Sequence, residues 1–228
     1  MKSKRYKKLP VNTKEQVAEK IEGLLSMVRS NCTSKFDESI DISVKLGVDP
    51  DKSDQNVRGA VTLPNSLGKE VKIAVFADGD HASDAQTAGA EYVGMDDLAE
   101  KFQKDEVNVD VVLSTNSAMK VVGKLGQVLG PKGLMPNPKT GTVSDDVVTA
   151  IKNVKAGQVR FRTDKNGIIH GSIGKVSFEG NKIKANASAL LEELRKLKPA
   201  SAKGVYIGNI ALSSTMGPGV KINPGELV

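Results

Sequence analysis

Cysteine, histidine and aromatic residues are scarce in this sequence of 228 residues. The single cysteine, Cys32, excludes an intramolecular disulfide, and the two histidines, His81 and His170, lie far apart along the chain. Because no Cys or His residues have the spacing of metal ligands, the sequence predicts neither a metal site nor a Cys–His nucleophile. Tryptophan is absent and aromatic residues make up only 4%, so the core must consist mainly of Val, Ile, Leu, Ala and Met.

Long apolar segments are missing as well. No apolar run approaches the roughly 20 residues that a membrane-spanning helix needs. The basic start, MKSKRYKKLP, is not followed by an apolar stretch, so it lacks the pattern of a signal peptide. We therefore expect a soluble intracellular protein that does not enter a membrane.

A complete phosphate-binding motif is also lacking, although the stretch LGQVLGPKGLMPNPKTGTV (125–143) is rich in glycine, proline and lysine. A P-loop requires G-x-x-x-x-G-K-[ST], whereas Lys132 follows Pro131 and precedes a glycine. The dinucleotide motif G-x-G-x-x-G is absent too. The stretch FADGDHASD (76–84) has one glycine and three acidic residues, which would repel a phosphate. A nucleotide-dependent enzyme or switch is therefore the weaker alternative, and we expect no catalytic residue and no cofactor.

Charge is distributed unevenly over the chain. The whole sequence has 33 Lys and Arg against 27 Asp and Glu, a net charge of +6, and an isoelectric point near 9.2. Residues 68–157 contain 10 basic and 13 acidic residues, a net charge of −3, which leaves +9 for the two flanking segments. A basic surface indicates an anionic partner, most often nucleic acid, although an inert basic surface remains the alternative. If nucleic acid binds, it should bind the flanks first.

The spacing of apolar residues predicts similar elements in both flanks. The N-terminal flank contains a helix over 13–31, which begins with a Thr13/Gln16 capping box, and strands over 34–48 and 57–64. The C-terminal flank contains a hairpin over 158–174 around Asn166-Gly167, a helix over 181–198 and a strand over 204–214.

The central segment has a different pattern, in which short apolar runs alternate with helical stretches. The helices include 117–129 and 144–154, and the alternation favours a parallel sheet covered by helices. Each flank is too short to bury a good core alone. The sequence thus predicts a discontinuous α+β domain, residues 1–67 and 158–228, with a separate α/β domain, residues 68–157, inserted in it.

Five long stretches carry a resemblance to one protein family. They are LGQVLGPKGLMPNPKTGTV, KFDESIDISVKLGVDPDKSDQNVRGAVTLP, AGAEYVGMDDLAEK, AGQVRFRTDKNGIIHGSIGK and AKGVYIGNIALSSTMGPGVKINP. The sequence resembles the large-subunit ribosomal protein family numbered one, the proteins of the mobile side stalk. The stretches follow the family order and together span nearly the whole chain.

This resemblance implies a fold and a set of partners. The expected fold is a discontinuous α+β RNA-binding domain with an inserted Rossmann-like, three-layer α/β domain that has no cofactor. The implied role is to bind large-subunit ribosomal RNA (rRNA) at the side stalk, to assist release of exit-site transfer RNA (tRNA), and to repress translation of the protein's own operon messenger RNA (mRNA). It implies a cytoplasmic component of the large ribosomal subunit that is not an enzyme and is a monomer when free.

The resemblance also indicates which residues contact RNA. Lys35 could contact a phosphate and Ser39 a 2′-hydroxyl, while Phe36 packs on a ribose or base or, alternatively, belongs to the core with Ile40. Near the C-terminus, Thr215 exchanges hydrogen bonds with a 2′-hydroxyl. The remaining residues expected at this RNA site are Ser213, Met216 and Gly217, with a simple C-terminal turn as the alternative.

Two further groups are expected near RNA. In the hairpin, Arg160 and Arg162 share one face and Lys165 is a phosphate ligand, while Asp164 orients a lysine or accepts a 2′-hydroxyl. Secondary positions have either an RNA contact or an interdomain contact, and they are Lys132, Lys139, Asn56 and Arg58.

Overall fold

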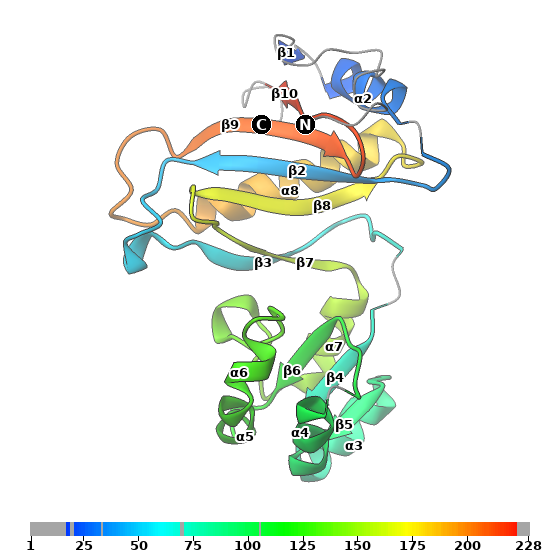
Figure 1. Cartoon of the computed structure of the whole chain (residues 1–228), viewed down its shortest axis with the longest axis vertical. Coiled ribbons are helices and arrows are strands. Elements are labelled where there is room, and N and C mark those ends of the chain that lie inside the picture. Colours follow the sequence, from blue (N-terminus) through cyan, green and yellow to red (C-terminus); the bar gives the residue numbers. More distant parts are fainter. Residues whose placement is uncertain (1–16, 19–20, 33, 69–70, 105, 223–228) are drawn as a thin grey trace. The chain divides into compact units, whose positions relative to one another are not determined.

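The computed structural model describes residues 17–18, 21–32, 34–68, 71–104 and 106–222. The chain divides into two compact units, which are drawn in Figure 1. We call them the flanking unit, Met1–Leu67 with Val159–Val228, and the central unit, Gly68–Gln158. Gln158, which the sequence assigned to the flank, lies in the central unit.

A five-stranded sheet forms the centre of the flanking unit. Its strand order is β1-β10-β9-β2-β8, in which β2 pairs antiparallel with both β8 and β9 (Figure 1). The strands are β1 (Val17–Ala18), β2 (Ser39–Leu46), β8 (Ile168–Lys175), β9 (Ile207–Ser214) and β10 (Val220–Ile222).

One face of this sheet is apolar and covered by a helix. Along β2, alternate residues such as Ile40, Ile42 and Val44 are fully buried, as the alternating pattern predicts. They share one core with Leu190 and Leu194 of α8 (Gly180–Lys196), which lies behind the sheet in Figure 1. The intervening residues of β2 are polar and half-buried or exposed, so the opposite face of the sheet is polar.

The start of the chain differs from the predicted helix over 13–31. Val17–Ala18 form strand β1, which pairs in parallel with β10, and helix α2 begins only at Ile21 and ends at Ser30. Pairing with a strand from the other end of the chain overrides the local helical spacing here. The proposed capping residues Thr13 and Gln16 lie outside the described residues.

The predicted hairpin over 158–174 is wrong in its pairing. Strand β7 (Gln158–Arg162) forms a two-stranded sheet with β3 (Arg58–Thr62), while β8 pairs with β2. Only an isolated bridge, Thr163–Ile169, joins the two arms. Thr163 instead donates its N–H to Val57 O at 3.0 Å, so a longer-range partner has taken the place of the local one. Gly167 has φ +72°, as the Asn-Gly turn requires.

The strand order in the central unit is β5-β4-β6, and all its pairings are parallel. The buried side chains of β4 alternate, so that Val75 packs with α3 and α7 whereas Phe76 packs with α4, α5 and α6. Helices therefore cover both faces of this sheet. The elements are β4 (Ile73–Phe76), β5 (Tyr92–Gly94), β6 (Val111–Ser114), α3 (Gly79–Thr87), α4 (Asp96–Gln103), α5 (Met119–Lys124), α6 (Gly126–Leu129) and α7 (Val147–Lys155).

The predicted helix over 117–129 is divided into α5 and α6 at Leu125. Leu125 donates its N–H to Val122 O, three residues earlier, which tightens the turn there. Its side chain is 1% exposed, so burial of Leu125 accompanies the break. Of all the helices in the described part of the chain, none is long and apolar enough to cross a membrane.

Candidate nucleic-acid interface

Two turns of the flanking unit meet at one end of the sheet. The first, residues 34–39, leads into β2, and the second, residues 214–217, begins at the last residue of β9. Because β2 and β9 are antiparallel, the start of one lies beside the end of the other, and Ile40 pairs with Ser214. We call this meeting point the turn junction. It brings together six of the predicted RNA contacts, namely Lys35, Phe36, Ser39, Thr215, Met216 and Gly217, and the seventh, Ser213, lies in β9 just before the second turn.

Backbone and side chain both fasten the turn junction. The Thr215 amide donates to Ser39 O at 3.0 Å, and the Ser39 amide donates to Thr215 Oγ1 at 3.0 Å. Thr215 Oγ1 also lies 3.3 Å from Ser39 O, to which it donates. The Thr215 hydroxyl is therefore engaged in holding the junction, although the residue itself is exposed.

The tips of both turns carry apolar side chains in solvent. Phe36 is 55% exposed and Met216 is 49% exposed, and they are two of the three large hydrophobic residues exposed in the described chain. Sharing sequence parity with Ile40 therefore does not make Phe36 part of the core, because β2 begins only at Ser39. Exposed apolar side chains beside exposed Lys35 suit contact with both the faces and the phosphates of a nucleic acid.

Packing within the second turn favours glycine at position 217. A Cβ on Gly217 would collide with Ser214 Oγ, and Ser214 is buried. The sequence predicts Gly217 at the RNA site. The structure adds a packing constraint within the turn that operates without any ligand.

Sequence reasoning missed Glu38, which lies beneath the turn junction. Its carboxylate accepts hydrogen bonds from Ser34 Oγ and, at 3.0 Å, from the Met216 amide. Burial by itself raises the pKa of Glu38, but these bonds and the nearby Ser214 hydroxyl outweigh that effect and hold the pKa below its ordinary value. The same position in the sequence, between Asp37 and Ser39, looks like part of a solvated polar loop.

A polar strip runs from the turn junction along the open face of the sheet. Asp41 pairs in register with Ser172 of β8 and Ser213 of β9, and Ser43 Oγ lies 3.1 Å from His170 Nδ1. Burial raises the pKa of Asp41, although the Ser172 hydroxyl and His170 act against it. Sequence reasoning missed Asp41 too. Its alternation with Ile40 and Ile42 was the signal that could have placed it on this face.

The RNA residues predicted in the hairpin lie toward the opposite end of β2, around the β7–β8 turn. The Leu46 amide donates to Gly167 O at 2.9 Å, which fixes this turn beside the end of β2. The length of β2, eight residues at about 3.3 Å each, separates the turn junction from this second group by roughly 25 Å. The predicted site therefore comprises two clusters joined by the polar strip.

Asp164 acts within its own turn. Its Oδ1 accepts from the amides of Asn166 and Ile168, both at 2.8 Å, and its Oδ2 lies 3.6 Å from His170 Nε2. The amide of Ile168 contributes most to holding the pKa of Asp164 below its ordinary value, with further contributions from Asn166 and His170. Asp164 thus braces the loop that carries Lys165.

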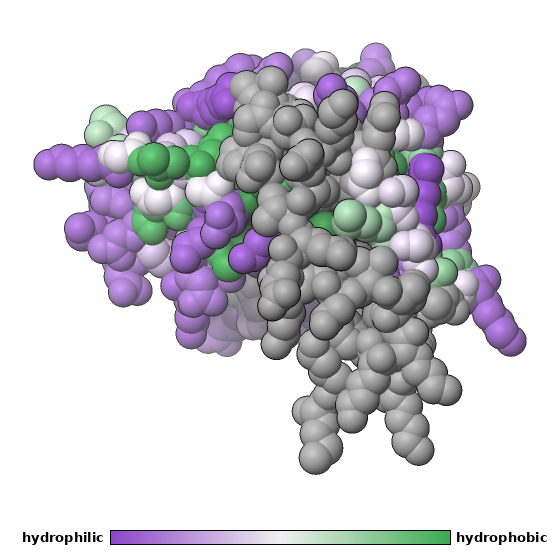
Figure 2. All heavy atoms as spheres, turned by 90° about the horizontal axis from the view of Figure 1, so that it is seen from above, coloured by the Kyte–Doolittle hydropathy of each residue, from purple (hydrophilic) through white to green (hydrophobic). Residues whose placement is uncertain are grey.

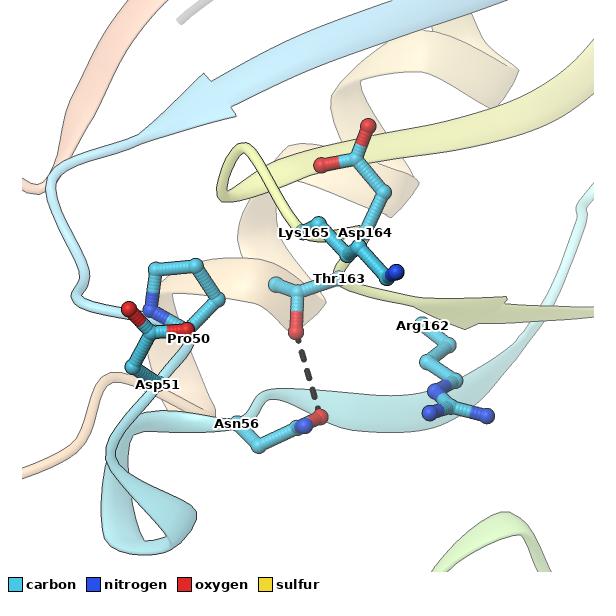
Figure 3. Close-up of a pocket in the computed structure, with 7 residues that line it drawn as sticks. All are labelled: Pro50, Asp51, Asn56, Arg162, Thr163, Asp164 and Lys165. Carbon is cyan, nitrogen blue, oxygen red and sulfur yellow. Dashed lines mark hydrogen bonds between the residues drawn. The ribbon is translucent and has the colours of Figure 1, made fainter.

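An open pocket of about 440 Å³ lies beside this turn and is shown in Figure 3. Thr163 Oγ1 donates to Asn56 Oδ1 at 3.2 Å across its floor, and Arg58 Nε donates to the same oxygen at 3.2 Å. These hydrogen bonds link Arg58, Asn56 and Thr163 within the flanking unit. The pocket is lined by Pro50, Asp51, Asn56, Arg162, Thr163, Asp164 and Lys165.

The two arginines of β7 differ in exposure. Arg162 and Lys165 are exposed and offer cationic groups on one side of the pocket, whereas Arg160 is half-buried. The neighbouring Phe161 is buried in the core. Arg162 is therefore better placed than Arg160 for a phosphate.

Ser43, His170 and Asp164 have the residue types of a nucleophilic triad but not its setting. The His170 side chain is 59% exposed, and its Nε2 lies 3.6 Å from the Asp164 carboxylate, which is longer than a hydrogen bond. The carboxylate is already committed to two backbone amides. The described residues also contain no group of three or more His, Cys, Asp or Glu side chains that could hold a metal ion.

The Gly/Pro stretch, with Lys132 and Lys139, belongs to the central unit. Its amides bond internally: Gly133 N to Gly130 O, Leu134 N to Leu129 O, and Lys139 N to Asn137 Oδ1. Buried Thr142 accepts from the Asn137 amide at 2.7 Å. A phosphate cradle needs amides that point at the ligand, so these amides do not form one. Lys132 and Lys139 are exposed on a braced loop.

Comparison with known proteins gives a consistent result. Residues 28–218 match the ribosomal protein L1p/L10e family. The chain is 60% identical over 203 residues to the large ribosomal subunit protein uL1 of Pseudoalteromonas atlantica, which covers 89% of this chain and 87% of that protein. It is 54% identical over 225 residues to the proteins of the same name from Burkholderia lata and Saccharophagus degradans, with 99% of this chain and 97% of each relative covered.

Proposed function

Because this chain belongs to the ribosomal protein L1p/L10e family, we propose that it binds large-subunit rRNA at the mobile side stalk through the turn junction of its flanking unit. The family consists of structural RNA-binding proteins rather than enzymes, and relatives covering most of this chain are named as proteins of the large ribosomal subunit. The protein is accordingly an RNA-binding ribosomal protein and not an enzyme, and it works on the ribosome in the cytoplasm.

The observation that carries this proposal is the exposure of Phe36 and Met216 on two turns that are hydrogen-bonded to each other. Apolar side chains held in solvent by hydrogen-bonded turns suit stacking on bases or riboses. The composition supports the same partner, since the two flanking segments carry a net charge of +9. Among the coloured residues in Figure 2, hydrophilic residues outnumber apolar ones, which suits a polar, wet RNA interface.

The second cluster extends this interface. Exposed Arg162 and Lys165 contact phosphates at the far end of β2. Between the clusters, the serine hydroxyls of the polar strip exchange hydrogen bonds with 2′-hydroxyls, and the Asp41 carboxylate accepts hydrogen bonds from them. Phosphate contacts position the RNA and the turn junction supplies the close fit. An interface whose polar strip bonds to 2′-hydroxyls would distinguish RNA from DNA, because only RNA has the 2′-hydroxyl.

The finer role follows from the family resemblance. The protein assists release of exit-site tRNA from the ribosome and represses translation of its own operon mRNA. A messenger that imitates the rRNA site would use the same turn junction, so the two RNAs would compete. The protein is a monomer when it is free of the ribosome, and it works without a membrane or a cofactor.

The two compact units correspond in this proposal to two domains. The flanking unit is the discontinuous α+β RNA-binding domain, and the central unit is an inserted Rossmann-like α/β domain. The internally bonded amides of the Gly/Pro stretch argue against the nucleotide-dependent alternative. Exposed Lys139 of that stretch could make a supporting RNA contact, and Lys132 is exposed on the same stretch.

Hydroxyl-radical footprinting tests the proposed function. The purified protein is added to a transcript of the stalk base of large-subunit rRNA, with a transcript of equal length from another rRNA region as the control. We expect a compact protected segment on the stalk transcript alone. Equal protection of both transcripts would reduce the protein to a non-specific basic binder and would contradict the proposal.

A further inference from the structure

Glu38 stands apart from the other ionisable residues of this protein. It is 1% exposed, and it is the one charged side chain in the buried class among the described residues. None of the ion pairs found between described side chains involves it. Taking a carboxylate out of water is costly unless hydrogen bonds or a cation replace the lost hydration. Hydrogen bonds must therefore stabilise this charge.

Those hydrogen bonds come from both turns of the junction. Ser34 Oγ, on the first turn, donates to Glu38 Oε1, and the Met216 amide, on the second turn, donates to Oε2 at 3.0 Å. The two oxygens of one carboxylate thus join the turn that carries Phe36 to the turn that carries Met216. The depressed pKa of Glu38 agrees with this geometry, because hydrogen bonds to the charged form favour it.

The bond to Met216 also completes the backbone of the second turn. Strand β9 ends at Ser214, so the three amides that follow lie outside the strand and each needs a partner. The Thr215 amide bonds to Ser39 O, and the Gly217 amide bonds to Ser214 O at 3.2 Å. Glu38 accepts from the remaining one, that of Met216. These amides are all occupied, so the turn is not an anion-binding nest and RNA must be contacted by its side chains.

We propose that Glu38 is a positioning residue of the RNA site, whose buried carboxylate locks the Met216 turn against the Phe36 turn so that RNA meets both side chains in one arrangement. Glu38 itself does not touch RNA. The inference rests on the proposed RNA-binding function and adds the residue through which the junction keeps its shape. It also explains why a negative charge is placed beneath a surface that receives a polyanion.

The test compares three single variants in binding to the stalk-base transcript. Glu38→Ala removes both acceptors, and we expect about tenfold weaker binding, equivalent to about 1.4 kcal/mol. Glu38→Gln keeps the shape and one acceptor for the Met216 amide, so we expect binding within about threefold of the unmodified protein. Glu192→Ala removes an exposed glutamate from α8 and serves as the matched control, with unchanged binding expected.

A double-mutant cycle separates positioning from a general effect on stability. If Glu38 acts through Met216, then Glu38→Ala should cost less than about twofold once Met216→Ala is present, because contacting sites are not additive. Thermal melting establishes that each variant is folded at the assay temperature. Glu38→Leu, which fills the buried volume, replaces Glu38→Ala if the latter is unfolded.

The outcomes distinguish failure of this inference from failure of the proposed function. Binding of Glu38→Ala at the unmodified level, or full additivity with Met216→Ala, overturns the inference and leaves the proposed function standing. Failure of the unmodified protein to bind the transcript overturns the proposed function itself. Tenfold loss in Glu38→Ala, recovery in Glu38→Gln and a non-additive cycle together support the positioning role.

Discussion

Thr215 and Ser39, which are 176 residues apart in the sequence, exchange hydrogen bonds in both directions at the ends of β9 and β2. The Thr215 amide donates to Ser39 O and the Ser39 amide donates to Thr215 Oγ1, both at 3.0 Å. The Thr215 hydroxyl thereby joins the two chain segments that carry the exposed apolar side chains Phe36 and Met216. The effect of removing it should be visible in folding as well as in binding.

Thr215→Val keeps the shape of the side chain and removes the hydroxyl. We expect it to lower the free energy of unfolding by about 1 kcal/mol, because the Ser39 amide loses its acceptor. RNA affinity should fall about tenfold, since the junction loosens and a 2′-hydroxyl partner is lost. Urea denaturation and filter binding measure the two quantities. Thr215→Ser should restore both, and a Thr215→Val protein with unchanged stability would contradict the bracing role of the hydroxyl.

Gly217→Ala tests the packing constraint in the second turn. The new Cβ would collide with Ser214 Oγ, which must rotate away, so we expect a loss of about 1 kcal/mol in the free energy of unfolding, the low end of the range for overpacked sites. Ser214→Ala removes the obstructing oxygen, so the double variant should recover most of the stability. If the double variant is stable yet still fails to bind the stalk transcript, close approach of RNA is the additional reason for glycine.

Asp164 should contribute a pH-dependent part of the stability. Its pKa in the folded protein is lower than the ordinary Asp value of about 3.9, so protonation favours the unfolded chain. The contribution is complete above that ordinary value and is lost as the pH falls through the lower folded value. We expect the melting temperature of the unmodified protein to fall more steeply between pH 5 and pH 3 than that of Asp164→Asn; parallel curves would contradict the assignment.

The two clusters should respond differently to salt. If about four to six phosphates are neutralised, a plot of log affinity against log salt should have a slope of about −3 to −5. The Arg162→Gln/Lys165→Gln double variant should make that slope shallower by about 1.5. Phe36→Ala should weaken binding at every salt concentration with the slope unchanged. An identical slope for all three proteins would mean that Arg162 and Lys165 do not face the RNA backbone.

The flanking unit should bind RNA without the central segment. Replacing residues 68–157 with a short Gly/Ser linker removes a segment of net charge −3 and keeps the flanks at +9, so most of the affinity for the stalk transcript should remain. Circular dichroism and a cooperative thermal melt establish that the shortened protein is folded. Loss of binding by a folded protein of this kind would show that the central unit contributes directly to the interface.

Local patterns in the sequence were sufficient for much of the fold. Alternation of apolar residues predicted β2, and helical spacing predicted α7 and α8, because burial of one face determines each of these elements. The sequence also showed the difference in net charge between the flanking segments and the central segment. Strand β1 and the pairing of β7 with β3 were not, because in both cases a distant partner decided the outcome.

The sequence by itself determined the family, the alternating faces of the strands and the residue types that suit RNA. Tertiary structure alone decided which of those residues meet. It placed Phe36 outside the core, hydrogen-bonded the Asp164 carboxylate to the backbone of its own turn, and buried Glu38 under Met216. The physical reason is that exposure and hydrogen-bond partners depend on segments such as 34–39 and 214–217, whose contact is set by strand pairing across the whole chain and not by local spacing.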